Sequence, residues 1–217
     1  FVADGFAAAF LFFSHAGQRG PVNGKKKALY KSGTIRNVKR NGIHYSLDLS
    51  DYQEWLIFFY CKSDSSDHVL NYLGQAIHIF DIGANIGSYA IYAGISRDMQ
   101  VVAFEPSPFN IEFLAKNIWL NNLEKRITVI PIPLSNDAIK APLLMKSIEW
   151  GNSGSTFGEN YGERGQPIEV EFEYNTIGFS MDQAMNWLRL GQPDYIKLDV
   201  DGIEGLILSG GTTVLSK

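Results

Sequence analysis

The sequence predicts an α/β fold: a Rossmann-like, doubly wound sheet in which most strands run parallel. From residue 76 onward, short apolar runs alternate with stretches of helical periodicity, which is the pattern of strand–helix–strand units. Each run is apolar on both faces, as in parallel sheets that helices cover on both sides. The composition agrees with a globular chain, because 45% of the 217 residues are hydrophobic and 19% are charged.

Four parallel strands and the helices that follow them form the core of the predicted domain of residues 76–217. The strands are expected at Ala76–Ile82, Val101–Phe104, Ile127–Ile130 and Pro193–Asp199. The helices are expected at Tyr89–Ile95, at about Phe109–Leu120, and from a Ser180 cap to about Leu190. Between the third and fourth strands, Ala141–Ile148 and Ile168–Tyr174 flank the Gly-rich loop Gly151–Gly165, and we expect these two stretches to pair as an antiparallel flap.

Residues 1–75 are expected to form an N-terminal extension that contains a strand pair. Ile43–Leu49 alternates apolar and polar residues, and Thr34–Lys39 is its partner across a tight turn. The aromatic stretch Tyr52–Tyr60 fits either a helix or a strand, because periodicity does not decide between them. The apolar run Phe6–Phe13 is predicted to be a buried helix, with the remnant of a signal segment as the alternative.

Charge, cysteine content and apolar runs restrict the partners. Residues 15–45 contain eight Lys and Arg and no Asp or Glu, although the net charge of the chain is −4. Because only Tyr30 and Tyr45 accompany these charges, we expect a solvated arm and no nucleic-acid partner. Methylation of RNA, bound through this segment, is the alternative. The single cysteine excludes a disulfide framework. No apolar run approaches the roughly 20 residues that span a bilayer, so the cytoplasm is the default location, and the oligomeric state is left open.

A ligand crevice is predicted where the first strand of the domain ends. Asp81-Ile-Gly-Ala-Asn-Ile-Gly87 sits at the carboxyl end of that strand and opens a helix, and in open α/β sheets ligands bind at such turns. Gly83 and Gly87 let the backbone turn sharply and approach the ligand. Glu105 ends the second strand, at the roughly 20-residue separation from which an acid binds the ribose hydroxyls of a nucleoside.

The nature of the loop argues against a dinucleotide. The glycines of a Gly-x-Gly-x-x-Gly fingerprint are replaced at two positions, by Asn85 and Ser88, and a phosphate-binding Gly-x-x-x-x-Gly-Lys motif is absent. The Asp81 carboxylate would repel a pyrophosphate but attract the ammonium and sulfonium groups of S-adenosylmethionine. A tight turn without a ligand is the structural alternative.

Four motifs, in order and spacing, resemble those of the FkbM-type methyltransferases, which are class I S-adenosylmethionine-dependent enzymes. They are Asp81–Gly87, Val102–Pro108, Ser153–Thr156 and Ile196–Glu204, and the resemblance covers roughly residues 43–215. It implies O-methylation of a hydroxyl on a small molecule or sugar. The absence of an Asp/Asn-Pro-Pro-Tyr/Phe motif, typical of amino-methylating enzymes, also favours an oxygen acceptor.

The resemblance assigns roles to several residues of the cofactor site. It implies that Asp81, Gly83 and Asn85 hold the methionine end of the cofactor and that Glu105 binds the ribose. Pro106 and Ser107 would shape the adenine side. Ser135 and Asn136 match the place where such enzymes hold the adenine edge, with Asp137 as a second choice, while a simple turn at 135–137 is the structural alternative.

The catalytic group is expected at the end of the fourth strand. Asp199 would take the proton from the acceptor hydroxyl, or hold a divalent cation that lowers the pKa of that hydroxyl. With only oxygen ligands nearby, Mg²⁺ would suit such a site better than Zn²⁺. Asp201 and Glu204 are further catalytic candidates, and each also fits a helix N-terminus, where the dipole favours an acidic side chain.

The C-terminal end of the chain departs from the family pattern. A sheet of this family continues beyond its fourth strand, whereas the sequence stops after the following helix. We therefore expect a fragment of a longer protein, with an open edge on the fourth strand. The alternatives to methyl transfer are a nucleotide-sugar or nicotinamide enzyme on the same fold, and a truncated, non-catalytic methyltransferase-like module.

Overall fold

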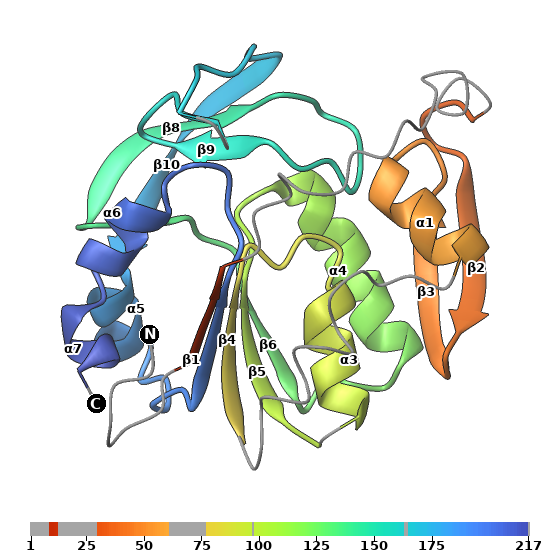
Figure 1. Cartoon of the computed structure of the whole chain (residues 1–217), viewed down its shortest axis with the longest axis horizontal. Helices are drawn as coiled ribbons and strands as arrows, with labels where there is room; N and C mark the ends of the chain where they lie inside the picture. The colour runs from red at the N-terminus through yellow and green to blue at the C-terminus, as the bar shows by residue number, and fades with distance from the viewer. Residues whose placement is uncertain (1–8, 13–29, 61–76, 97, 163–164, 217) are drawn as a thin grey trace.

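A five-stranded parallel sheet forms the centre of the molecule (Figure 1). The computed structural model describes residues 9–12, 30–60, 77–96, 98–162 and 165–216. In spatial order the strands are β1 (Ala9–Phe12), β11 (Tyr195–Leu198), β4 (His78–Ile82), β5 (Gln100–Phe104) and β6 (Ile127–Ile130). All four neighbouring pairs are parallel, which confirms the predicted Rossmann-like sheet.

Helices cover both faces of this sheet (Figure 1). On one face lie α3 (Ser88–Ser96) and α4 (Pro108–Leu120), and on the other lie α5 (Met181–Trp187), α6 (Glu204–Ser209) and α7 (Thr212–Leu215). Strand residues alternate between the two resulting cores: Ile79 packs in the first and Phe80 in the second. This alternation determines which acidic side chains of the strands can reach the predicted ligand crevice.

A second sheet lies over the carboxyl ends of the parallel strands (Figure 1). Its order is β7 (Leu134–Ser135), β10 (Phe172–Ser180), β8 (Ile139–Met145) and β9 (Ser155–Phe157). β8 and β10 pair antiparallel, as the flap prediction requires. β9 adds a third antiparallel strand, so Ser155 and Thr156 belong to a strand and not to the predicted loop.

The bounds of β10 correct the prediction for this part of the chain. The strand expected at Ile168–Tyr174 begins at Phe172 and continues to Ser180, because residues 172–178 pair with β8 and Phe179 and Ser180 pair with β7. Ser180 is therefore both the last residue of the strand and the cap of α5. Its hydroxyl accepts a hydrogen bond from the amide of Gln183, which confirms the predicted cap.

The N-terminal strand pair packs outside α4 (Figure 1). β2 (Ile35–Arg40) and β3 (Ile43–Asp48) form the predicted hairpin, and α1 (Tyr52–Tyr60) is a helix, which decides the alternative left open by periodicity. The amide of Ser46 donates to Asn117 Oδ1 of α4 at 2.6 Å, which anchors the hairpin to the helix. The predicted domain boundary at 75/76 lies outside the described residues.

Residues 9–12 correct two expectations. They form the strand β1, not part of a helix, and they run parallel to β11 on the edge that we expected to be open. A short apolar run suits a buried parallel strand as well as a helix, and only the pairing partner decides between the two. Among the described residues, no helix is long and apolar enough to cross a bilayer.

Two buried acidic residues, Asp48 of β3 and Glu54 of α1, lie where the hairpin meets α1. Glu54 is 1% exposed, and its Oε2 accepts a hydrogen bond from the amide of Asp48 at 2.5 Å. Its Oε1 has no hydrogen-bond partner in the part of the chain that is described, and it lies against the backbone of Gly151. Burial, with smaller contributions from the nearby Asp51 and Asp48, raises the pKa of Glu54 well above 4.5.

This raised pKa makes the stability of the fold pH-dependent. Because the folded state holds the Glu54 proton more tightly than the unfolded state, the stabilisation is complete below pH 4.5 and is lost as the pH rises through the folded pKa. Above pH 4.5 we expect the wild type to lose stability relative to Glu54→Gln, by at most about 1.4 kcal/mol per pH unit. Urea denaturation of both proteins between pH 4 and pH 8 measures this, and parallel stability curves would contradict it.

Candidate functional site

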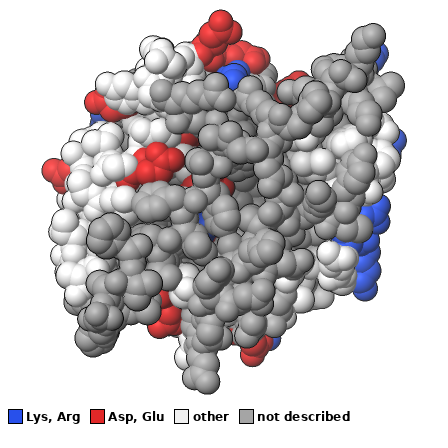
Figure 2. Space-filling model, in the orientation of Figure 1, with Lys and Arg blue, Asp and Glu red and all other residues white. Residues whose placement is uncertain are grey.

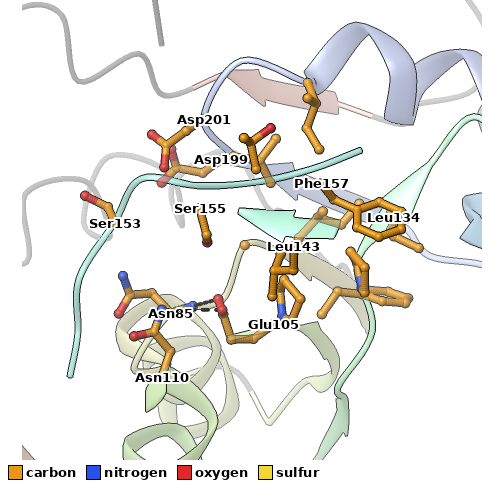
Figure 3. A pocket seen from close by; sticks show the side chains of 18 of the residues that line it. Asn85, Glu105, Asn110, Leu134, Leu143, Ser153, Ser155, Phe157, Asp199 and Asp201 are labelled. Atoms are coloured by element: carbon orange, nitrogen blue, oxygen red, sulfur yellow. Dashed lines mark hydrogen bonds between the residues drawn. The ribbon is translucent and has the colours of Figure 1, made fainter. Parts of the chain in front are cut away.

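A pocket opens at the carboxyl ends of β4, β5 and β11, beneath the second sheet (Figure 3). It is a hollow of about 600 Å³, including its open mouth. Asn85, Glu105 and Asn110 line one side, and Asp199 and Asp201 line another. A third part is apolar and includes Leu134, Leu143 and Phe157. The pocket therefore lies at the crevice that the sequence predicts.

The β4–α3 turn is shaped by two glycines. Gly83 has φ +77°, and a Cβ there would lie 2.0 Å from the backbone oxygen of Asp199. Gly87 has φ +87°, and a Cβ there would lie 2.5 Å from the Leu114 side chain. Gly83 lines the pocket, whereas Gly87 is not part of its lining. Gly87 thus serves the packing of α3 on α4, and Gly83 brings the turn against β11.

The structure places Asp81 beneath the pocket and not in its wall. Asp81 is on the same face of β4 as Ile79, the face that packs on α3, and it is fully buried. Its Oδ1 is 3.0 Å from Nζ of Lys197, which lies beside it in the parallel register. Strand alternation therefore directs Asp81 to the α3 side of β4, outside the described lining of the pocket.

Lys197 connects three parts of the site. Its ammonium group pairs with Asp81, donates to the carbonyl of Gly83 at 2.7 Å, and lies 3.6 Å from Asp199 Oδ2. Burial alone would lower the pKa of Lys197, but the carboxylates of Asp81, Asp199 and Glu105 raise it, so the group stays protonated. Burial raises the pKa of Asp81, and the Lys197 charge opposes this shift.

Glu105 receives three hydrogen bonds at the end of β5. The amides of Asn85 and Ser107 donate to its carboxylate at 2.7 and 2.9 Å, and Asn110 Nδ2 donates at 3.3 Å. Burial raises the pKa of Glu105, while these donors favour the charged form. Glu105 lines the pocket, as predicted for a ribose-binding acid, and its carboxylate is held in place by the turns around it.

The loop of residues 151–154 closes the pocket and is anchored by side chains from the β4–α3 turn, from α4 and from the β11–α6 turn (Figure 3). Asn85 Nδ2 donates to the carbonyl of Gly151 at 3.0 Å, and Asn110 Nδ2 donates to that of Asn152 at 3.2 Å. The amide of Gly154 donates to Asp201 Oδ2 at 2.5 Å. Asn85 thus contributes to the pocket by fixing this loop as well as by lining it.

The three acidic residues after β11 occupy different places. Asp199 lines the pocket, and a quarter of its side chain is exposed. Asp201 also lines the pocket, but its carboxylate binds the loop at Gly154. Glu204 is in the first turn of α6, outside the pocket lining. Of the three predicted catalytic candidates, the structure brings Asp199 and Asp201 together and leaves Glu204 aside.

Of the predicted adenine-side residues, Pro106 lines the pocket, whereas Ser107, Ser135 and Asn136 do not. Ser107 is buried at the N-terminus of α4, where its amide supports Glu105. Ser135 is buried beside Gly210, and Asn136 is exposed. Neither Ser135 nor Asn136 is part of the lining, which at this point consists of Ile132, Pro133 and Leu134. Apolar side chains therefore stand where we expected a polar edge.

Sequence reasoning missed two residues of the site. Lys197 had a signal, because a lysine in the middle of an otherwise apolar strand needs a buried partner. Asn110 had none, since an asparagine in the first turn of a helix is unremarkable in sequence. No group of three or more His, Cys, Asp or Glu suited to a metal ion occurs among the described residues, so the Mg²⁺ alternative gains no support.

The pocket is acidic. Glu105, Asp199 and Asp201 line it, and its described lining contains no Lys, Arg or His. The basic side chains of the described hairpin lie elsewhere: Figure 2 shows Lys and Arg at the right-hand edge of this view, where Figure 1 places β2. Arg36 and Lys39 of β2 are exposed, and Arg40 donates to the carbonyl of Phe58.

Comparison with known proteins finds a family match and distant relatives. A family model described as the methyltransferase FkbM domain matches residues 81–217. The methyltransferase sdnD of Sordaria araneosa is 26% identical over 156 residues, which is 61% of this chain and 59% of that one. A tRNA(Phe) (4-demethylwyosine(37)-C(7)) aminocarboxypropyltransferase of Pyrococcus horikoshii is 25% identical over 116 residues, 51% of this chain and 40% of that one.

The chain thus spans 59% and 40% of the lengths of these two curated relatives. Among solved structures, the methyltransferase FkbM of Methylobacillus flagellatus superposes with a TM-score of 0.44 at 20% identity. That alignment covers 65% of this chain and 30% of the other.

Proposed function

Because the chain belongs to the FkbM family of S-adenosylmethionine-dependent methyltransferases, we propose that it transfers a methyl group to a hydroxyl of a small polar molecule or sugar. The observation that carries this proposal is the acidic pocket, with Asp199 at its wall and no described basic lining residue. Such a pocket favours a cationic cofactor and a neutral acceptor over a phosphorylated one.

The chemical division of the pocket fits S-adenosylmethionine. The apolar wall of Ile132, Leu134, Leu143 and Phe157 suits the adenine ring, and the adjacent Glu105 suits the ribose. Gly83 and Asn85 suit the methionine end, with Asp81 acting indirectly through Lys197. We leave Ser135 and Asn136 out of this proposed site because apolar residues take their place in the lining.

The chain's own residues supply alignment and a base. S-adenosylmethionine, when bound, supplies an electrophilic methyl group that needs no further activation. Asp199 accepts the proton of the acceptor hydroxyl, and Lys197 holds its carboxylate at the end of β11. Asp201 keeps the 151–154 loop closed through Gly154, which fixes the pocket wall beside the acceptor.

Glu105→Ala is expected to weaken S-adenosylhomocysteine binding by roughly 10- to 100-fold. The variant loses a carboxylate that accepts hydrogen bonds from ligand hydroxyls, and a hydrogen bond to a charged group contributes about 1.5–3 kcal/mol. Calorimetric titration measures the affinity, and circular dichroism checks that the variant is folded. Glu124→Ala is the matched control, because Glu124 is an exposed glutamate that does not line the pocket. Equal affinity of the Glu105 variant and the wild type would contradict the assignment.

RNA is the second candidate acceptor, since one relative acts on tRNA and residues 15–45 are basic. The pocket disfavours a nucleotide acceptor, because its charged lining residues are all acidic and would repel a phosphate group. Methyl transfer to bulk tRNA that falls steeply with added salt would favour RNA. Transfer to neutral polyhydroxylated compounds, unaffected by salt, would favour the small-molecule acceptor.

A further inference from the structure

Asn110, a residue at the polar end of the pocket, has an unsatisfied amide oxygen. Asn110 lines the pocket and is 3% exposed. Its Nδ2 donates to Glu105 Oε1 and to the carbonyl of Asn152. Its Oδ1 is buried and has no hydrogen-bond partner among the described residues. Buried polar atoms without a partner are rare in native proteins, so this oxygen requires an explanation.

The orientation of the Asn110 amide follows from its partners. Both contacts of Nδ2 are oxygen atoms that only accept: a carboxylate oxygen and a backbone carbonyl. A flipped amide would place an oxygen against both of them. The free end of the side chain is therefore Oδ1, an acceptor, and the ligand atom that it suits is a donor.

Glu105 has little acceptor capacity left for a ligand. A carboxylate offers about four lone-pair sites, and the donors on Asn85, Ser107 and Asn110 use three of them. A ribose carries two neighbouring hydroxyls that both donate. Its second hydroxyl requires another acceptor, and Asn110 lies directly beside Glu105 (Figure 3).

We propose that Asn110 is a ribose-binding residue whose Oδ1 accepts a hydrogen bond from one hydroxyl of the nucleoside diol, while Glu105 accepts from the other. This inference rests on the proposed function, since it assumes an adenosine-containing cofactor. It also gives Asn110 a second role, because the same amide group fixes Asn152 of the closing loop. The ribose, Glu105 and the loop are thereby joined through one side chain.

The test is a thermodynamic cycle between protein and ligand. S-adenosylhomocysteine and its 2′-deoxy and 3′-deoxy counterparts are titrated calorimetrically into the wild type and Asn110→Ala. In the wild type, both deoxy ligands are expected to bind more weakly than S-adenosylhomocysteine, because one of them leaves Glu105 without a ligand donor. The other leaves Asn110 Oδ1 buried and unpaired, and its affinity is expected to fall about tenfold. In Asn110→Ala this discrimination is expected to shrink to within about twofold for that ligand.

Asn117→Ala is the matched control. Asn117 is a fully buried asparagine on the same helix, bonded to Ser46 and Ile86 and outside the pocket lining. Its variant is expected to keep the discrimination between the ligands even where overall stability falls. Unchanged discrimination in Asn110→Ala, with S-adenosylhomocysteine still binding the wild type, would overturn the inference alone. No binding of S-adenosylhomocysteine by folded wild type would overturn the proposed function, and the inference with it.

Discussion

Lys197→Met is expected to lower the free energy of unfolding by about 3–5 kcal/mol, the usual cost of removing one partner of a buried ion pair. The substitution keeps most of the side-chain volume but leaves the Asp81 carboxylate fully buried without a cation. It also removes the donor to the Gly83 carbonyl. Urea denaturation followed by circular dichroism measures the loss as a lower midpoint at an unchanged slope.

Two further variants separate charge from packing. Asp81→Asn combined with Lys197→Met removes both charges, and it is expected to recover much of the stability, because a neutral buried pair carries no unpaired charge. Lys116→Met is the matched control, since Lys116 is an exposed lysine of α4, and its effect is expected within about 0.5 kcal/mol. A loss below about 1 kcal/mol for Lys197→Met would contradict the role of the ion pair.

Asp199→Asn is expected to slow methyl transfer by about 10²- to 10⁴-fold, the contribution of a general base. The amide is similar in shape but cannot take the proton from the acceptor hydroxyl. Binding of S-adenosylhomocysteine is expected to change little, because the side chain is partly exposed and its neighbours Lys197 and Asp81 remain paired. The measurement is transfer of radiolabelled methyl to whichever polyhydroxylated acceptor the wild type turns over.

Asp201→Asn provides the comparison for this experiment. The Asp201 carboxylate accepts the amide hydrogen of Gly154, and an amide oxygen at this position still accepts it. We therefore expect a smaller loss of rate than for Asp199→Asn, with the acceptor KM affected more than kcat. If Asp199→Asn retained the wild-type rate while Asp201→Asn lost it, the base would be Asp201 and our assignment would be wrong.

The elements of the central sheet and its helices were predictable because each is identified by a pattern of residues close together in the chain. Apolar runs such as Val101–Phe104 and the cap at Ser180 depend on neighbours in the chain, and such patterns are readable without a partner. β10 was predicted with wrong bounds for the opposite reason. It is half-exposed and mixes polar and apolar residues, so its extent is set by pairing with β8 and β7.

The position of the site was predictable from the sequence, but the ion pairs and hydrogen bonds among its residues were not. The turn at Gly83 and the acid Glu105 line the pocket, as expected from the ends of consecutive strands. The place of Asp81 depends on which face of β4 it occupies and on the register with Lys197, and neither is visible in one sequence. The same holds for Asn110, because one of its partners, Asn152, comes from a distant loop.

The 151–154 loop has a consequence for how the protein tolerates evolutionary change. Surface loops usually accept insertions and deletions readily. Here residues 151, 152 and 154 are bonded one after another to side chains from the β4–α3 turn, from α4 and from the β11–α6 turn. Adding or removing one residue would move the remaining donors and acceptors of the loop away from their hydrogen-bond partners. The length of this loop is therefore constrained as strictly as that of a strand.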